Sequence, residues 1–293
     1  MQYQPAKLVL AAMAANLLAT PSAEASEKAV ALTPISSWNV HWADASCRLG
    51  RLFGSADRPF QLMLTAYGPG DLFEISLAGL DLKPLESRSS PTIAFGPGGP
   101  LKLLGRTLAT TDDHRPAWLF NFALLAAERP QQASSDAGIR PLDEAFVAKV
   151  DRITIRAGSH SLVLETGPVA QAIRALQVCT SDLVKTWGLD PVVQQSLTRT
   201  PSPEDAQGLT RAVAAVYPPA MLAMGKQARV NIHVVVDAQG AVTTCSTPQS
   251  YSDPAFDKLP CVAIAKARFV PALDRDGKPT ASYYNTTVTY KIN

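Results

Sequence analysis

Histidine and acidic side chains are the residues of this chain that could most readily do chemistry. Asp112, Asp113 and His114 stand in a row, and such a cluster could bind a metal ion or transfer protons. Their setting, residues 110–116, is a polar stretch typical of a solvated turn. The histidines are His41, His114, His160 and His233, and none pairs with another or with a carboxylate at the spacing of a metal motif. We therefore expect no metal ion, no cofactor and no catalytic residue.

Two further stretches resemble catalytic motifs but lack the residues that the chemistry needs. Residues 95–100 are rich in glycine, yet they lack the Lys-Ser/Thr pair of a phosphate-binding loop, and their prolines remove amide donors. No G-x-S-x-G motif occurs, and residues 159–161 fall at the expected tip of a hairpin. The sequence therefore argues against an enzyme. An envelope enzyme with its site in residues 35–190 is kept as an alternative.

The most regular strand pattern lies in the last third of the chain, at residues 229–236. Side chains of a strand alternate between its two faces, so one face here is apolar and the other carries Asn231 and His233. The apolar face consists of Val230, Ile232, Val234 and Val236. We expect His233 to lie on the surface of the sheet. Residues 282–292 repeat the alternation and predict a closing strand.

A second strand and a helix are predicted between these two strands. A turn at residues 237–240 leads into a strand at 241–250, and a helical segment follows at 253–267. Pro260 is expected to kink or split this helix, because proline lacks an amide donor and clashes with the preceding turn. The pattern predicts a small α+β unit, with one antiparallel sheet and a helix packed on one face.

Several short features of residues 217–293 recur in an order that is known from one family. They are Tyr217, Pro218 and Ala220, then Asp237, Gly240 and Ser250, then residues 267–269, Pro271, Ala272 and residues 277–279. In this order and spacing they resemble the C-terminal domain of TonB-like energy transducers. The resemblance covers residues 208–293 and leaves the preceding two thirds of the chain without a recognised family.

The resemblance implies a binding function. The family is known to accept a short segment of an outer-membrane receptor beside the last strand of its sheet, through main-chain hydrogen bonds. Here the partner would be a segment of such a receptor or of another envelope protein. The implied binding strand consists of Tyr283, Tyr284, Asn285, Thr286, Thr287, Val288 and Thr289. The alternative is that these residues only complete the sheet, with their edge covered by the domain in front.

Composition and charge narrow the range of functions. The chain has 293 residues, of which 46% are hydrophobic and 18% charged, so it can bury a substantial core. This length suggests about two domains. The net charge of +2, without any basic run, gives no support for nucleic-acid binding.

The first residues have the composition of an export signal. Lys7 precedes an apolar run at residues 8–18, and Ala23 and Ala25 form a small-x-small cleavage site before Ser26. The run is about a dozen residues, whereas a membrane span needs about 20. We expect a signal peptide at residues 1–25 and a periplasmic protein. The alternative is an uncleaved anchor in the inner membrane, as in a TonB-type energy transducer.

The region between the signal and the TonB-like unit is predicted to be rich in strands. Residues 26–34 are expected to be a flexible lead and residues 35–190 a β-rich domain of unknown function. Hairpins are predicted at residues 60–77 and 151–165, and a further strand at 101–108. A helix with one apolar face closes this domain at residues 168–187. The prolines of residues 191–207 predict a semi-rigid linker, much shorter than the Pro-rich spacer of true transducers.

Four cysteines in an exported chain suggest disulfide bonds. The simplest of the three possible pairings keeps each bond within one domain, joining Cys47 to Cys179 and Cys245 to Cys261. Free buried thiols and a redox pair are the alternatives, although no C-x-x-C motif occurs.

Overall fold

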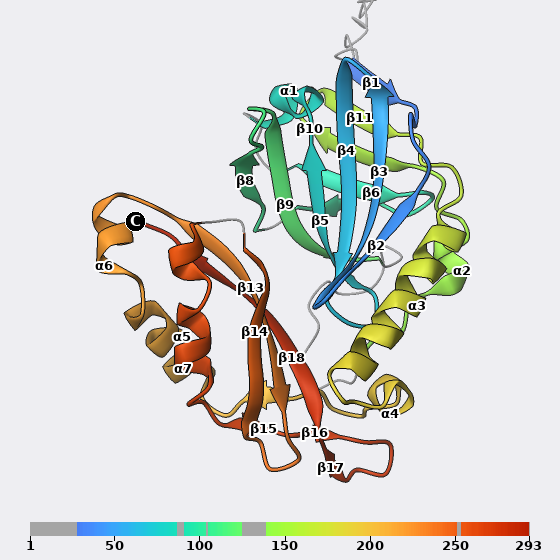
Figure 1. Ribbon diagram of the computed structural model, residues 1–293. Coiled ribbons are helices and arrows are strands. Elements are labelled where there is room, and N and C mark those ends of the chain that lie inside the picture. Colours follow the sequence, from blue (N-terminus) through green and yellow to red (C-terminus); the bar gives the residue numbers. More distant parts are fainter. Residues whose placement is uncertain (1–27, 87–90, 104, 125–138, 251–252, 293) are drawn as a thin grey trace, which may run out of the picture.

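The protein is described here by a computed structural model, which shows a mixed α+β fold (Figure 1). It describes residues 28–86, 91–103, 105–124, 139–250 and 253–292. The predicted signal peptide therefore lies outside the described residues.

A six-stranded antiparallel sheet forms one layer of the N-terminal region, in the order β2-β3-β4-β5-β9-β8. Its strands are β2 (Asn39–Ala43), β3 (Ser46–Ser55), β4 (Arg58–Ala66), β5 (Leu72–Ala78), β8 (Thr107–Thr110) and β9 (Pro116–Ala123). Phe60, Leu62 and Leu64 alternate along β4 and are buried. The predicted hairpin at residues 60–77 is confirmed, since β4 pairs with β5.

A second, five-stranded sheet has the order β1-β11-β10-β6-β7. Its strands are β1 (Lys28–Leu32), β6 (Thr92–Phe95), β7 (Leu101–Lys102), β10 (Ile153–Ala157) and β11 (His160–Leu164). The hairpin predicted at residues 151–165 is confirmed by the pairing of β10 with β11. Short helical turns also occur in the region: η1 (Leu80–Leu82), α1 (Lys83–Glu86) and α2 (Glu144–Val147).

Two predictions for the strands of the N-terminal region are wrong. Residues 28–32 are not a flexible lead but form β1, which pairs in parallel with β11, because the edge of β11 offers backbone groups that need partners. The strand predicted at residues 101–108 is instead two short strands in different sheets. Gly105, with a φ of 68°, lies between β7 and β8, and such a left-handed residue turns the chain.

Helix α3 (Ala170–Thr186) closes the N-terminal region as predicted. Both sheets and this helix contribute to one hydrophobic core, to which α3 gives Ile173, Leu176, Cys179 and Leu183. A disulfide bond joins Cys179 to Cys47 of β3. The helix is therefore fixed to the six-stranded sheet both by packing and covalently.

The segment predicted to be a linker is folded and packed. It contains α4 (Pro191–Gln195) and β12 (Ser202–Pro203). Gln194 is 1% exposed. Its amide donates a 3.0 Å hydrogen bond to the carbonyl oxygen of Ala281 and accepts one of 2.6 Å from the Ser282 hydroxyl. Since these bonds fix the segment to the last strand, it cannot act as a free tether.

The C-terminal region contains the predicted antiparallel sheet, in the order β14-β13-β18. Its strands are β13 (Ala228–Val236), β14 (Val242–Ser250) and β18 (Ser282–Tyr290). Short strands β15 (Phe269–Val270), β16 (Ala272–Leu273) and β17 (Pro279–Thr280) pair as β12–β15 and β16–β17. The helical elements are α5 (Ala206–Ala215), α6 (Pro219–Ala223), η2 (Pro254–Phe256) and α7 (Leu259–Ile264).

The helix predicted at residues 253–267 is split, as Pro260 led us to expect. Pro260 lies in the first turn of α7, where a missing amide donor is tolerated. Cys261 of α7 forms a disulfide bond with Cys245 of β14. Both predicted disulfide bonds are therefore present in the structure.

Both faces of the C-terminal sheet are covered. Figure 1 shows α5 and α7 on one side of the sheet, while the N-terminal sheets lie at the upper right of the picture. Every residue of β13 is buried. The prediction that His233 lies on the surface is wrong, because the N-terminal region covers the polar face of this strand; His233 is 1% exposed.

Candidate partner-binding site

Strand β18 forms one edge of the C-terminal sheet and contains all seven residues that were predicted to bind a partner. It pairs with β13 over its whole length, from Ala228 opposite Tyr290 to Val236 opposite Ser282. Within the part of the chain that the structure describes, no strand pairs with its other side. The backbone on that side could therefore accept an added strand.

Side chains alternate across β18, as the period of a strand requires. Tyr284, Val288 and Tyr290 pack with the helix-facing hydrophobic cluster. Asn285 and Thr287 point the other way and bond to residues of β13: the Thr287 hydroxyl donates a 2.7 Å bond to the Asn231 side-chain oxygen. One face of β18 thus holds the strand in place, and the other meets the N-terminal region.

A cleft of about 690 Å³ runs beside β18. One side is formed by residues 283–287 of this strand and the other by residues 67–74, which connect β4 to β5 and begin β5. Ile139, Arg140, Thr200 and Pro201 also line it. The cleft brings together the predicted partner-binding strand and a loop that lies more than two hundred positions earlier in the chain.

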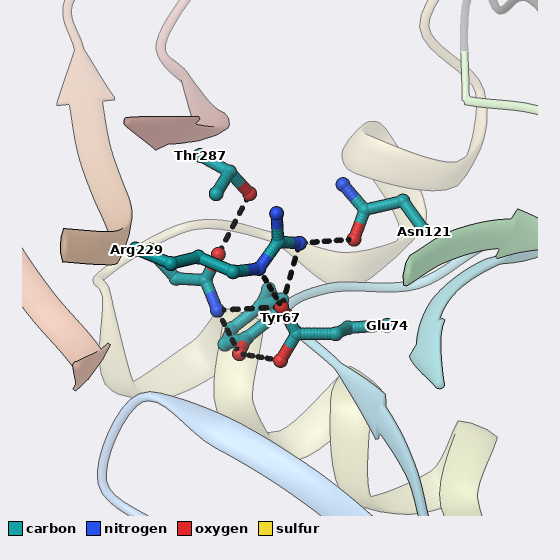
Figure 2. Close-up of polar contacts among 6 residues, drawn as sticks. Tyr67, Glu74, Asn121, Arg229 and Thr287 are labelled. Atoms are coloured by element: carbon teal, nitrogen blue, oxygen red, sulfur yellow. Dashed lines mark hydrogen bonds and ion pairs between the residues drawn. The ribbon is translucent and has the colours of Figure 1, made fainter. Parts of the chain in front are cut away.

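A network of polar side chains, of which Glu74, Arg229 and Asn231 are buried, joins the two regions at this cleft (Figure 2). The Arg229 guanidinium donates a 3.0 Å hydrogen bond to the Glu74 carboxylate and a 3.2 Å bond to the Asn121 side-chain oxygen. The Asn231 amide donates to the same Glu74 oxygen at 2.9 Å and to the Tyr67 hydroxyl at 2.6 Å. Glu74 is 2% and Arg229 7% exposed. Removing either Glu74 or Arg229 would break a buried ion pair.

His233 packs in an aromatic environment next to this network. Its ring lies 3.9 Å from that of Trp187, centre to centre, and its Nδ1 is 2.8 Å from the Asn285 side-chain oxygen. Burial lowers the pKa of His233, because the charged imidazolium loses its hydration there, while the hydrogen bond with Asn285 acts in the opposite direction. Burial also raises the pKa of the neighbouring Tyr283. Both side chains are therefore uncharged near neutral pH.

Asn285 and Tyr283 also contact the loop of the N-terminal region directly. The Asn285 amide donates a 2.7 Å hydrogen bond to the backbone oxygen of Tyr67. Gly68 lies so close to Tyr283 that a Cβ atom there would be 2.5 Å from the phenol oxygen. Only glycine allows this approach of the loop to β18.

The acidic row at residues 112–114 is a surface turn between β8 and β9. Asp113 bonds to the Arg115 guanidinium at 2.7 Å, and the hydrogen bond from Thr111 lowers its pKa most. His114 has a φ of 63°. Among the described residues, no group of three or more metal-binding side chains occurs. The row is part of a turn and is not among the residues that line the cleft.

Sequence reasoning missed the polar network beside the cleft, which consists of Tyr67, Glu74, Asn121, Arg229 and Asn231. A signal was present at Glu74, the charged residue of a strand that is apolar apart from Ser76, since a carboxylate buried in a strand needs a cation. Arg229 and Asn231 alternate on the polar face of the most apolar strand, and this face could have been read as an interface.

The comparisons with known proteins concern the C-terminal region. Residues 213–292 match the family described as Gram-negative bacterial TonB protein C-terminal. The solution NMR structure of the Pseudomonas aeruginosa TonB C-terminal domain is 27% identical, over 26% of this chain and 77% of that chain, with a TM-score of 0.23. The comparison with curated proteins gives no match. Residues 213–292 are thus a TonB C-terminal domain, and the region before them is unassigned.

None of the helices in the described ranges is both long and apolar enough for a transmembrane span.

Proposed function

We propose that this protein works in the bacterial envelope and binds an extended segment of an outer-membrane receptor, or of another envelope protein, along the outer side of β18. The observation that carries the proposal is that β18 is a sheet edge and that its residues 283–287 line a cleft. TonB C-terminal domains generally bind outer-membrane receptors, and the match of residues 213–292 supports the same partner class here.

A periplasmic location is consistent with the two disulfide bonds, which form and persist in oxidising compartments. The predicted signal peptide at residues 1–25 supports export as well. We favour a binding protein over an energy transducer, because residues 191–207 are packed against the C-terminal sheet and leave no long spacer between the two regions. If the protein is instead a membrane-anchored transducer, its mature N-terminus should be Met1. If it is an envelope enzyme, its activity should depend on residues 112–114.

The test is an NMR titration of the full-length mature chain, labelled with ²H and ¹⁵N, with N-terminal peptides of the host's outer-membrane receptors. We expect amide shifts concentrated in residues 283–289. The control is the same peptide with alternate backbone nitrogens methylated, which keeps the side chains but removes the donors for strand addition. Equal shifts with both peptides, or none at millimolar concentration, would refute the proposal.

A further inference from the structure

The loop between β4 and β5 is built as a wall beside β18. Residues 67–70 meet the strand through two contacts, the hydrogen bond from Asn285 to the Tyr67 carbonyl and the close approach of Gly68 to Tyr283. Residues 70–74 continue the same side of the cleft. The wall and the edge strand come from different regions of the chain, so the cleft exists only in the assembled protein.

Helix α3 holds the wall in position. The Gln177 side chain forms two bonds with the backbone of Gly70: its amide donates to the carbonyl at 3.0 Å and its oxygen accepts from the amide at 3.5 Å. Two residues further along α3, Cys179 is bonded to Cys47. Cys47 is paired with Ala66 in the β3–β4 ladder, directly before the loop. Gln177 therefore connects the loop to a helix that is covalently tied to β3, the strand that pairs with β4 directly before the loop.

The charges along the wall are compensated within the protein. The Asp71 carboxylate lies 3.3 Å from the Arg140 guanidinium, and the Glu74 carboxylate 3.0 Å from that of Arg229. Tyr67, Pro69 and Ile139 supply uncharged surface, and Leu72 is 51% exposed. A charged side chain of the partner would lose its hydration on entering the cleft here. It would find these charges already paired within the protein, so the lost hydration would not be compensated.

From this arrangement we infer that the loop at residues 67–71, held by Gln177, is a specificity determinant that admits only an extended partner segment with small, uncharged side chains at every second position. This inference rests on the proposed binding to β18. A strand added to β18 would point alternate side chains to the face that carries Asn285 and Thr287, where the wall lies. Its other side chains would point to the opposite face, away from the wall.

The test uses the full-length mature chain and the receptor peptide that shifts β18 most. A tryptophan is moved through seven consecutive positions of this peptide, and the Kd is measured at each. In the wild-type protein we expect tryptophan to weaken binding about tenfold at every second position and much less at the positions between. Binding should also shift the amides of the loop.

Gln177→Ala removes the two bonds to the backbone of Gly70. The ratio of the Kd values at alternate peptide positions should then fall below about threefold. Gln171→Ala, an exposed glutamine of the same helix, is the matched control and should keep the wild-type pattern. If tryptophan changed the Kd for the wild-type protein equally at all seven peptide positions, while the β18 amides still shifted, the specificity role of the loop would be overturned. The proposed binding to β18 would remain intact. If no amide of the protein shifted on addition of peptide, both the binding proposal and the inference about the loop would be overturned. The same holds if two copies of the protein paired through β18 and peptides did not displace this dimer.

Discussion

The two faces of the C-terminal sheet are buried by different means. One face packs Val230, Val234 and Phe256 into an apolar cluster with the region's own helices. The other presents Arg229, Asn231 and His233 to the N-terminal region, which supplies a carboxylate and an aromatic ring in return. The difference teaches that alternation of apolar and polar residues identifies two faces, but does not tell whether the polar one meets water or protein.

This contrast has a consequence for stability. Apolar packing loses free energy in proportion to the volume removed, whereas a buried ion pair depends on both partners being present. The polar face should therefore respond more strongly to loss of one side chain than the apolar face does.

The largest effect is expected from Glu74→Ala, which leaves the Arg229 guanidinium buried without its carboxylate. The free energy of unfolding should fall by about 3–5 kcal/mol, measured by urea denaturation. Asp182→Ala, which breaks an exposed 2.7 Å pair with Lys185, is the control and should change it by at most about 1 kcal/mol. Equal decreases in the free energy of unfolding of the two variants would show that the buried ion pair contributes no more to stability than the exposed one.

A smaller loss is expected from Val234→Ala on the apolar face of the same strand. Val234 is 0% exposed, so removal of its two methyl groups should cost about 2 kcal/mol in the same urea experiment. If Val234→Ala lowered the free energy of unfolding more than Glu74→Ala does, the apolar face and not the polar face would be the more sensitive to loss of one side chain.

The histidine on the polar face should make stability depend on pH. Because burial lowers the folded-state pKa of His233 below its unfolded value, the unfolded chain binds the proton more readily. Stability from this residue is complete above about pH 6.5, the unfolded value, and decreases as the pH falls below it. His233→Gln should reduce this slope in pH-dependent urea unfolding, and an unchanged slope would contradict the prediction.

The smallest effect is expected from Asn285→Ala, which removes the hydrogen bond from β18 to the Tyr67 carbonyl and the one between Asn285 and His233. Loss of the two hydrogen bonds should together cost about 1–2 kcal/mol. Amide hydrogen exchange should increase in residues 67–70 and remain unchanged at β14, on the opposite edge of the sheet. Unchanged exchange in the loop would mean that its other contacts, such as the bonds from Gln177 to Gly70 and from Asn231 to the Tyr67 hydroxyl, are sufficient to hold it.

Local patterns were sufficient to predict many of the elements. The alternation in β13 and β18, the hairpins of the N-terminal region, the apolar face of α3 and the split at Pro260 all follow from side-chain period and backbone chemistry. The domain boundaries of the sequence analysis stay predictions, although residues 28–32 and 191–207 proved to be more ordered than expected. Their order comes from partners that lie far away in sequence, β11 for one and Ala281 and Ser282 for the other.

The sequence by itself determined the strand-helix-strand order of the TonB C-terminal domain, its apolar core and the strand at its edge, because each depends on residues close together in the chain. Tertiary structure alone decided that Glu74 meets Arg229, that His233 is buried and that residues 67–74 face β18 across a cleft. Glu74 and Arg229 are 155 positions apart, and no local periodicity encodes which polar face will close on which loop.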